Sequence, residues 1–563
     1  MAEKVKQYRH PDDPITLDEL KGFLWAAATH LRGQIDAAGY KEYIFPLLFF
    51  KRISDVYDEQ FEGFVCEGGV EYAGMQVEDL PIRIPDGAHW RDVREVTENV
   101  GNKLVEAFIA IEQANPAKEM DGRKIGGLEG IFGPKDGWTN KAKMPDNIIT
   151  SLIEDFSKYT LSLKACPADE MGQAYEYLVG KFADDAGNTA QEFYTNRTVV
   201  QLMAEILQPQ PNESIYDPTC GSGGMLVKCL DYLRNKGAEW QSVQVFGQEV
   251  NGLTSSIARM NLYLNGIEDF SIACADTLEN PAFLDGSHLR KFDIVLANPP
   301  YSIKEWNREK FMNDKWGRNF LGTPPQGRAD YAFIQHILAS MDEKTGRCAI
   351  LLPHGVLNRM EEEIMRRKLI EEDLVDSVIS IGKNLFFNSP MEACIMLCSS
   401  KKPSDRIKQV LFIRATDLVE RKNGESYLTE EHVEEIVSLY RGNTNVDNRS
   451  CIVDTKTISQ NEYSISPKLY VKQTQTENIL KFSDSTATKY LLLVGLLADL
   501  IGIIVLKYLT GKNDYISISI KFGIRFLLYS LVFLTNNLVV CFVAITWSIL
   551  IQTAYENITD APY

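Results

Sequence analysis

Four consecutive residues, Asn298, Pro299, Pro300 and Tyr301, follow directly on the strand-like run FDIVLA at 292–297. The Asn298 side-chain carbonyl and the Pro299 backbone carbonyl can together accept both hydrogens of one NH2 group. Binding both hydrogens directs the nitrogen lone pair towards an electrophile. Pro300 restricts the backbone, and Tyr301 offers a ring on which a base can stack. Taken alone, the four residues also fit a plain turn, so only their position in the fold can distinguish a turn from a binding site.

The segment DPTCGSGG at 217–224 follows the run SIY and leads into the helical pattern GMLVKCLDYL. Its glycines are Gly221, Gly223 and Gly224. They allow a sharp turn and a close approach of the backbone to a ligand, as in doubly wound sheets that bind a nucleoside cofactor there. A phosphate-binding loop would need a Lys and a hydroxyl where this chain has Met225 and Leu226. A nucleoside without phosphates therefore fits better.

Two further predicted strands end in a carboxylate, namely Glu249 in VFGQEV and Asp276 in ACAD. Glu249 can accept hydrogen bonds from both ribose hydroxyls, and Asp276 can take the exocyclic amine of an adenine. Each residue also fits an N-terminal cap of the following helix or turn. With Asp217 and Asn298, four successive strand ends carry a polar acceptor. We expect all four to lie along one edge of a sheet.

A parallel sheet is needed to position these residues, and residues 165–400 alternate short β-rich runs with helical patterns. This alternation predicts a doubly wound α/β fold. VDSVISI and EACIMLC are joined by a loop too short for a crossover helix, which predicts an antiparallel hairpin at the edge of a mixed sheet. Residues 1–160 predict a helical domain, with loops over 121–138. VLFIRA predicts one more strand, and EEHVEEIVSLYRG a surface helix.

The composition is that of an acidic globular protein. The 563 residues carry a formal net charge of −18 and contain 45% hydrophobic residues. A chain that held DNA alone would more often carry a basic face, so a partner is expected to supply much of any phosphate contact. The 10 cysteines show no CxxC pair or metal-ligand pattern, which indicates reduced thiols and no metal site. Cys394 and Cys398 lie in an apolar run and are predicted to be core residues.

The C-terminal residues 472–563 have a different character, because 490–506 and 526–551 are strongly apolar. The second segment is long enough to span a bilayer. Basic residues between the two segments favour a cytoplasmic loop, whereas the lysines before residue 490 favour the opposite orientation. The tail therefore predicts a membrane hairpin, a buried helical hairpin or partner-binding helices.

Together these motifs resemble those of amino-group DNA methyltransferases, and most closely the modification subunit of type I restriction–modification systems. The resemblance covers about residues 10–471 and rests on FPLLFFKRISD, QEFYTNRTVVQLMAEIL, DPTCGSGGML, ANPPY, LFFNSPMEACIML and NEYSISPKLYV. DPTCGSGG followed by NPPY in this order is specific. NPPY alone also occurs in enzymes that methylate protein glutamine or RNA base amino groups.

The resemblance implies a helical domain over 1–160, a Rossmann-like methyltransferase domain over 161–471 and a tail with two apolar helices over 472–563. It implies N6 methylation of an adenine flipped out of duplex DNA, with S-adenosylmethionine as cofactor. The cofactor residues that it implies are Tyr194, Thr195, Asp217, Thr219, Gly221, Ser222, Gly223, Gly224, Glu249 and Asp276. The residues that would hold the adenine are Asn298, Pro299, Pro300 and Tyr301.

The resemblance also implies partners: double-stranded DNA, a specificity subunit, a motor–nuclease restriction subunit and a second copy of the chain. The expected location is cytoplasmic, with membrane association through 490–551 if the tail inserts. The chain departs from the family in its tail and at Asn196, where Pro is common. Two other functions stay open, namely methylation of a protein glutamine or RNA base, and a membrane-tethered effector that binds cofactor or DNA without turnover.

Overall fold

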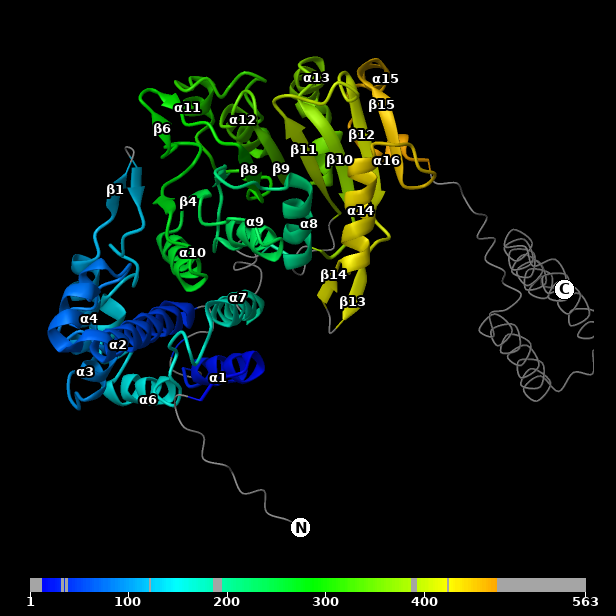
Figure 1. Cartoon of the computed structure of the whole chain (residues 1–563). Coiled ribbons are helices and arrows are strands. Elements are labelled where there is room, and N and C mark those ends of the chain that lie inside the picture. The colour runs from blue at the N-terminus through cyan, green and yellow to red at the C-terminus, as the bar shows by residue number, and fades with distance from the viewer. Residues whose placement is uncertain are drawn as a thin grey trace, which may run out of the picture. The chain divides into compact units, whose positions relative to one another are not determined.

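The computed structural model describes residues 13–31, 35, 39–120, 123–185, 195–385, 392–422 and 425–472 (Figure 1). The chain divides into two compact units, of which the first ends at Lys472. The apolar tail segments 490–506 and 526–551 lie outside the described residues. In the ranges given above, no helix combines the length and the apolarity that crossing a membrane requires.

The N-terminal part is a group of helices around one aromatic core. Its elements are α1 (Leu17–Thr29), α2 (Lys41–Gln76), η2 (Val77–Asp79), α3 (Trp90–Arg94), α4 (Val100–Ala114), α5 (Asp136–Thr139), α6 (Asp146–Phe156) and α7 (Ala168–Asp185). Phe108 of α4 stacks on Phe132 with ring centroids 4.1 Å apart, and Phe50 of α2 meets Phe108 edge-on. The buried Arg52 donates to three backbone carbonyls between residues 161 and 166. These bonds tie α2 to the chain that leads into α7.

The central element is a nine-stranded sheet with the strand order β15-β12-β10-β11-β9-β8-β3-β4-β5. The strands are β3 (Ser214–Asp217), β4 (Gln244–Glu249), β5 (Phe270–Cys274), β8 (Ile294–Ala297), β9 (Arg347–Pro353), β10 (Val375–Ile381), β11 (Ala393–Ser399), β12 (Gln409–Ala415) and β15 (Ser450–Asp454). β3 pairs in parallel with β4 and β8, and β4 pairs in parallel with β5. β11 and β15 run antiparallel to their neighbours, which makes the sheet mixed.

Helices cover both faces of this sheet (Figure 1). One face packs against α8 (Arg197–Leu207), α9 (Gly224–Asn235), α10 (Gly252–Leu264) and α14 (Glu430–Gly442). The other packs against α12 (Asp330–Ala339), α13 (Glu363–Glu371), α15 (Thr455–Gln460) and α16 (Pro467–Tyr470). In β8, Ile294 and Leu296 enter the first layer, while Val295 and Ala297 enter the second. Because helices cover both faces of the sheet, the strands appear in the sequence as continuous apolar runs.

Shorter elements connect this framework. They are β1 (Lys118–Met120), β2 (Arg123–Ile125), β6 (Leu284–Asp285), β7 (His288–Leu289), α11 (Arg308–Met312), η5 (His354–Leu357), η6 (Met360–Glu362), β13 (Glu420–Lys422) and β14 (Glu425–Tyr427). α10 also buries Ile257, Met260 and Leu264 in the N-terminal aromatic core. The helical part and the sheet therefore share α10 as a common packing element.

The mixed α/β sheet and the N-terminal helical region confirm these two parts of the predicted fold class, with two corrections of detail. β10 and β11 form the predicted antiparallel pair, but the pair lies inside the sheet, because β12 adds to β10 in parallel and β15 forms the edge. Side chains of β12 pack into the helix layers on both faces of the sheet, so this strand also lies inside the sheet. Part of the predicted loop region 121–138 forms β2, which pairs with β1. Cys394 and Cys398 are buried, as predicted.

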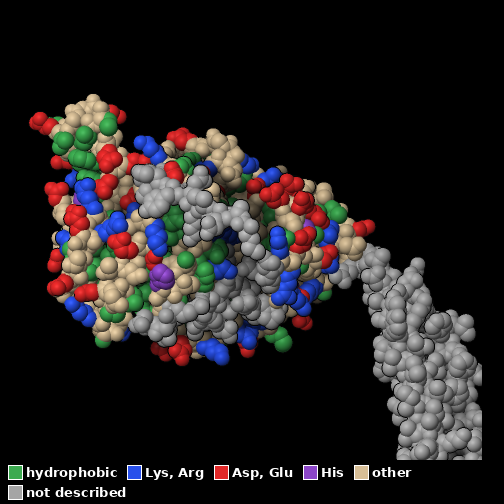
Figure 2. Space-filling model, turned by 90° about the horizontal axis from the view of Figure 1, so that it is seen from below, with side chains coloured by type: hydrophobic (Ala, Val, Ile, Leu, Met, Phe, Trp, Pro, Cys, Tyr) green, Lys and Arg blue, Asp and Glu red, His purple; other side chains and the backbone are tan. Residues whose placement is uncertain are grey.

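The surface view in Figure 2 shows how charge is distributed on one face of the molecule. Lysine and arginine side chains are interspersed with aspartate and glutamate there, without a continuous basic stripe among the described residues in view. Mixed charge of this kind does not offer the single-sign surface that attracts a DNA backbone.

Candidate active site

The polar strand ends lie along one edge of the sheet. Asp217 ends β3, Glu249 ends β4, and Asn298 follows directly on β8. Asp276 stands just beyond the end of β5. Because β8, β3, β4 and β5 are adjacent and parallel, their carboxyl ends face the same way. The structure thus brings all four residues to one edge, as the sequence predicts, while their roles stay predictions.

The glycine-rich turn is held against the neighbouring strand. The backbone N–H of Gly221 donates to Glu249 Oε2 at 3.1 Å. Gly221 and Gly223 have φ angles of 53° and 77°, a left-handed region that favours glycine. Gly223 is the N-terminal cap of α9, which begins at Gly224. The first backbone N–H groups of α9 therefore point towards this edge of the sheet without helical partners.

Asp217 is buried in the interior, with an exposed fraction of 0%. Its Oδ1 accepts the backbone N–H of Thr219 at 2.9 Å. Its Oδ2 and the Oγ1 of Thr219 are buried and have no hydrogen-bond partner among the described residues. Burial, reinforced by the nearby Glu249 carboxylate, raises the pKa of Asp217 to about 7. Such buried, unsatisfied atoms are costly unless a ligand meets them.

The other two carboxylates differ in exposure and in partners. Glu249 is buried, and besides Gly221 it accepts the backbone N–H of Asn251 through Oε1 at 2.8 Å. Asp276 is exposed, and its Oδ1 caps the following turn by accepting the N–H groups of residues 278–279. The capping role foreseen for Asp276 is therefore real, and both of these bonds use the same oxygen.

The Asn298 amide is half-buried and held at both ends. Its Nδ2 donates to Thr195 Oγ1 at 3.0 Å, and its Oδ1 accepts from the Tyr301 hydroxyl at 2.7 Å. Burial raises the pKa of Tyr301 well above its ordinary value, so this phenol stays a neutral donor. Pro299 is buried and Pro300 half-buried beside it. The predicted contribution of Tyr194 lies outside the described residues.

Residues 167–479 match the profile of the family described as N-6 DNA Methylase, and residues 20–156 match that of the HsdM N-terminal domain. The first match alone spans more than half of the chain. This chain belongs to the N-6 DNA methylase family. The two matches together also cover most of the helical region and the whole sheet.

Relatives of this N-6 DNA methylase share most of its length. The type I restriction enzyme MjaVIII methylase subunit of Methanocaldococcus jannaschii is 28% identical over 526 residues, which cover 87% of this chain and 86% of the relative. The HindI methylase subunit of Haemophilus influenzae is 30% identical over 350 residues, covering 60% and 76%. Among solved structures, the type I restriction-modification methyltransferase subunit of Streptococcus thermophilus aligns with a TM-score of 0.69 and 28% identity, over 81% of this chain and 100% of that one.

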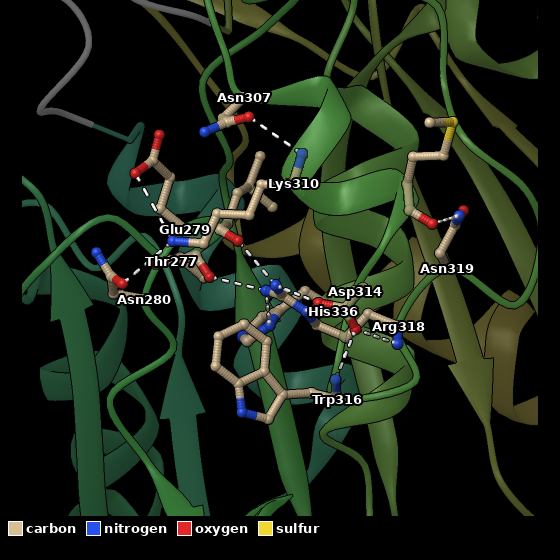
Figure 3. Close-up of polar contacts among 12 residues, drawn as sticks. Thr277, Glu279, Asn280, Asn307, Lys310, Asp314, Trp316, Arg318, Asn319 and His336 are labelled. Carbon is tan, nitrogen blue, oxygen red and sulfur yellow. Dashed lines mark hydrogen bonds and ion pairs between the residues drawn. The ribbon is translucent and has the colours of Figure 1, made fainter.

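In this N-6 DNA methylase, a buried network holds the segment after the Asn298 motif against the turn that follows β5 (Figure 3). Arg318 is 1% exposed and donates to the backbone carbonyls of residues 277 and 278 at 2.9 and 2.7 Å. It also pairs with Asp314 Oδ1 through Nε and Nη2. Nδ1 of His336 lies 3.3 Å from Arg318 Nη1, and burial together with Arg318 lowers the pKa of His336 well below its ordinary value.

A second, more exposed contact joins the same two segments of the methylase. Lys310 of α11 donates to Asn280 Oδ1 at 3.4 Å and lies 3.9 Å from Glu279 Oε2 (Figure 3). The turn that carries Asp276 is therefore positioned by the segment downstream of Asn298. This link could not be predicted from the sequence, because Arg318 lies in a polar segment without periodicity or motif.

A cavity next to the glycine-rich turn contains charged residues that sequence reasoning missed. Its lining includes Glu176 of α7, Arg197 of α8 and Lys228 of α9, together with Thr195 and Gly221. Glu176 lies in a segment with the sequence pattern of an amphipathic helix, in which a carboxylate is expected at the surface. Only the packing of α7 against the sheet domain reveals that it is buried.

Proposed function

We propose that this chain is the methyltransferase subunit of a type I restriction–modification enzyme and that it methylates N6 of adenine in DNA. The main support is the convergence of Asp217, Glu249, Asp276 and Asn298 at the carboxyl edge of one sheet. The relatives named above are methylase subunits of type I restriction enzymes, and the first of them matches the chain through both the helical region and the sheet. Amino-group transfer to a base is the chemistry for which an Asn-Pro-Pro-Tyr motif is suited.

S-adenosylmethionine fits the residues along this edge, and when bound it supplies a methyl group on a positively charged sulfur. The unsatisfied Oδ2 of Asp217 and Oγ1 of Thr219 match a ligand that brings polar atoms into the site. Glu249 holds the ribose hydroxyls and Asp276 the adenine amine. The residues that cradle the methionine end are Tyr194, Thr195, Asp217, Thr219, Gly221, Ser222, Gly223 and Gly224.

Asn298 and Pro299 hold the amino group of the target adenine. The Asn298 Oδ1 already accepts from Tyr301, but a carbonyl oxygen has two lone pairs and takes a second donor. The bond from Nδ2 to Thr195 fixes which way the amide faces. With both amino hydrogens engaged, the nitrogen lone pair points out of the base towards the methyl donor, and positioning supplies much of the acceleration.

The reaction takes place in the cytoplasm and needs partners. A specificity subunit reads the DNA sequence and supplies phosphate contacts that a chain of net charge −18 does not provide on its own. A motor–nuclease subunit performs restriction, and a second copy of the chain completes the modification complex. Double-stranded DNA is the substrate, with the target base turned out of the stack.

The test is transfer of a tritiated methyl group from S-adenosylmethionine to duplex DNA, with and without the specificity subunit. Asn298→Ala should lower the rate by about 100-fold or more, because it removes the acceptor that positions the amino group. Asn102→Ala, at an exposed position of α4, serves as the control. Full activity of Asn298→Ala would refute the role of the motif, and competition by RNA or glutamine peptides in place of DNA would indicate a different acceptor.

A further inference from the structure

The residue directly after the Asn298 motif has a strained backbone. Ser302 has a φ angle of 50°, in the left-handed region that residues with a side chain seldom adopt. Such a conformation persists only where the surrounding structure holds it, and it is common at functional sites. Because Ser302 follows Tyr301 in the chain, whatever fixes its conformation also fixes how the turn 298–301 leaves the edge of the sheet.

One buried carboxylate holds this residue. Asp330 is 1% exposed and accepts the backbone N–H of Ser302 through Oδ1 at 3.0 Å. Its Oδ2 accepts from Arg359 Nη1 at 2.8 Å. Asp330 is the first residue of α12, where an acid also interacts favourably with the helix dipole. Both bonds, however, lead out of α12, so they connect Asp330 to the motif in addition to any effect on the helix.

Arg359 comes from the chain that follows the neighbouring strand. β9 pairs in parallel with β8, so η5 and Arg359 follow β9 at the same edge of the sheet. Arg359 Nη1 also lies 3.3 Å from Oε1 of the buried Glu362, and Arg359 Nη2 lies 3.5 Å from Ser302 Oγ. A Cβ atom on Gly355 would lie 2.8 Å from Arg359 Nε. Glycine at position 355 therefore leaves the space in which the guanidinium reaches Asp330.

We propose that Asp330 and Arg359 are positioning residues, which hold Ser302 in its left-handed conformation and thereby fix the turn of Asn298 and Tyr301 for the target base. This proposal rests on the proposed function, since it assigns the base to that turn. Besides burial, the charge of Asp330 contributes to the raised pKa of Tyr301, which places the carboxylate close to the motif. The bonds of Asp330 and Arg359 named above involve none of the strand ends proposed to bind cofactor. The pair should therefore act on methyl transfer and not on cofactor affinity.

Methyl transfer and cofactor binding separate this role from a purely structural one. In the complete modification complex, Asp330→Ala should lower kcat for transfer to DNA by about 10- to 100-fold, because the turn loses its anchor. The affinity for S-adenosylhomocysteine, measured by calorimetry, should change by less than about 2-fold, because the two groups of residues are separate. Asp447→Ala, at an exposed position before β15, should change neither quantity.

Two further variants give results that general destabilisation would not produce. Glycine adopts the left-handed region without strain, so adding Ser302→Gly to Asp330→Ala should recover about 5-fold or more of the lost kcat. Gly355→Ala keeps Asp330 and displaces only the flexible end of Arg359, so the chain should fold. Its kcat should fall by about 3- to 30-fold, the loss expected for one charge-assisted hydrogen bond.

Unchanged kcat in Asp330→Ala would overturn the proposal. So would a loss of S-adenosylhomocysteine affinity as large as the loss of kcat, or no recovery on adding Ser302→Gly. If Asp330→Ala does not fold, the kcat of Gly355→Ala decides in the same way. A wild-type complex that transfers no methyl group to DNA would instead refute the proposed function.

Discussion

Asn298 shows how the structure prepares a single side chain for its task. Its amide is anchored at the nitrogen by Thr195 and at the oxygen by Tyr301, so its orientation is set before any substrate arrives. Preorganisation of this kind removes the cost of ordering the group during the reaction. The hydroxyl of Tyr301 uses one lone pair of Oδ1 and leaves the other for an amino hydrogen.

Two changes at Tyr301 distinguish its ring from its hydroxyl. Tyr301→Phe keeps the stacking surface and should retain methyl transfer within about 10-fold, the loss expected for one hydrogen bond. Tyr301→Ala removes the ring and should weaken DNA binding by roughly 5- to 150-fold, the usual worth of base stacking. Steady-state KM and kcat for DNA measure both effects. A Phe variant as defective as the Ala variant would show that the ring is not the contributing part.

Asp217 makes a pH-dependent contribution to stability. Its pKa is raised to about 7 in the folded chain, so the folded state retains a proton that the unfolded chain loses near pH 4. The residue therefore lowers the free energy of unfolding as pH rises from about 4 to 7, and the cost is constant above that range. Asp217→Asn should be more stable than wild type by about 2–4 kcal/mol at pH 8, with the difference shrinking towards pH 4.5.

Urea unfolding of both proteins at several pH values checks the Asp217 prediction. Glu434→Gln, at an exposed position of α14, is the control for a general charge effect. A stability difference that stayed flat between pH 4.5 and 8 would contradict the assignment of the raised pKa to Asp217.

The strand-end residues could be predicted from the sequence, whereas the groups around them could not. Asp217, Glu249 and Asn298 each end a run of apolar residues, and a parallel sheet places such ends together. Glu176 and Arg318 sit in segments whose local pattern is that of a solvated surface. Their burial depends on long-range packing of α7 and of the segment after Asn298, for which a local pattern carries no information.

Among the elements, the segment from α11 to Arg318 links two parts of the candidate active site. Its contacts with the turn after β5 connect the motif that holds the target base to the turn predicted to hold the cofactor adenine. The sequence predicted the strands on either side but not this connection. The same limit explains the misplaced hairpin, because loop length predicts that β10 and β11 pair but not which strands flank them.

Arg318→Met tests how much this link contributes to stability. It leaves Oδ1 of Asp314, whose side chain is 1% exposed, and two buried carbonyls without the Arg318 donors, so the free energy of unfolding should fall by about 3–5 kcal/mol. The exposed Lys315→Met should change it by less than about 0.5 kcal/mol. Urea unfolding measures both. If Arg318→Met were neutral, the network would be an incidental feature of the loop.

At the scale of the whole molecule, net charge determines how much the chain depends on a partner to bind DNA. The net charge is −18, and the face shown in Figure 2 mixes both signs. Phosphate contacts dominate DNA affinity, so a chain of this kind should hold a duplex weakly by itself. We therefore expect the affinity for DNA to depend on the proposed specificity subunit.

Fluorescence anisotropy of a labelled duplex measures this dependence. The chain alone should show a dissociation constant no tighter than about 1 µM at physiological salt, the range of non-specific binding. Addition of the specificity subunit should tighten binding into the nanomolar range. Nanomolar binding by the isolated chain would mean that it carries its own DNA-reading surface.

The most direct test of the central claim is nucleoside mass spectrometry of DNA after incubation with the complex and S-adenosylmethionine labelled in the methyl group. We predict that the label appears as N6-methyl-2′-deoxyadenosine, that Asn298→Ala abolishes it, and that Asn102→Ala leaves it unchanged. Label on cytosine, on RNA or on protein, or an unchanged yield with Asn298→Ala, would contradict the account.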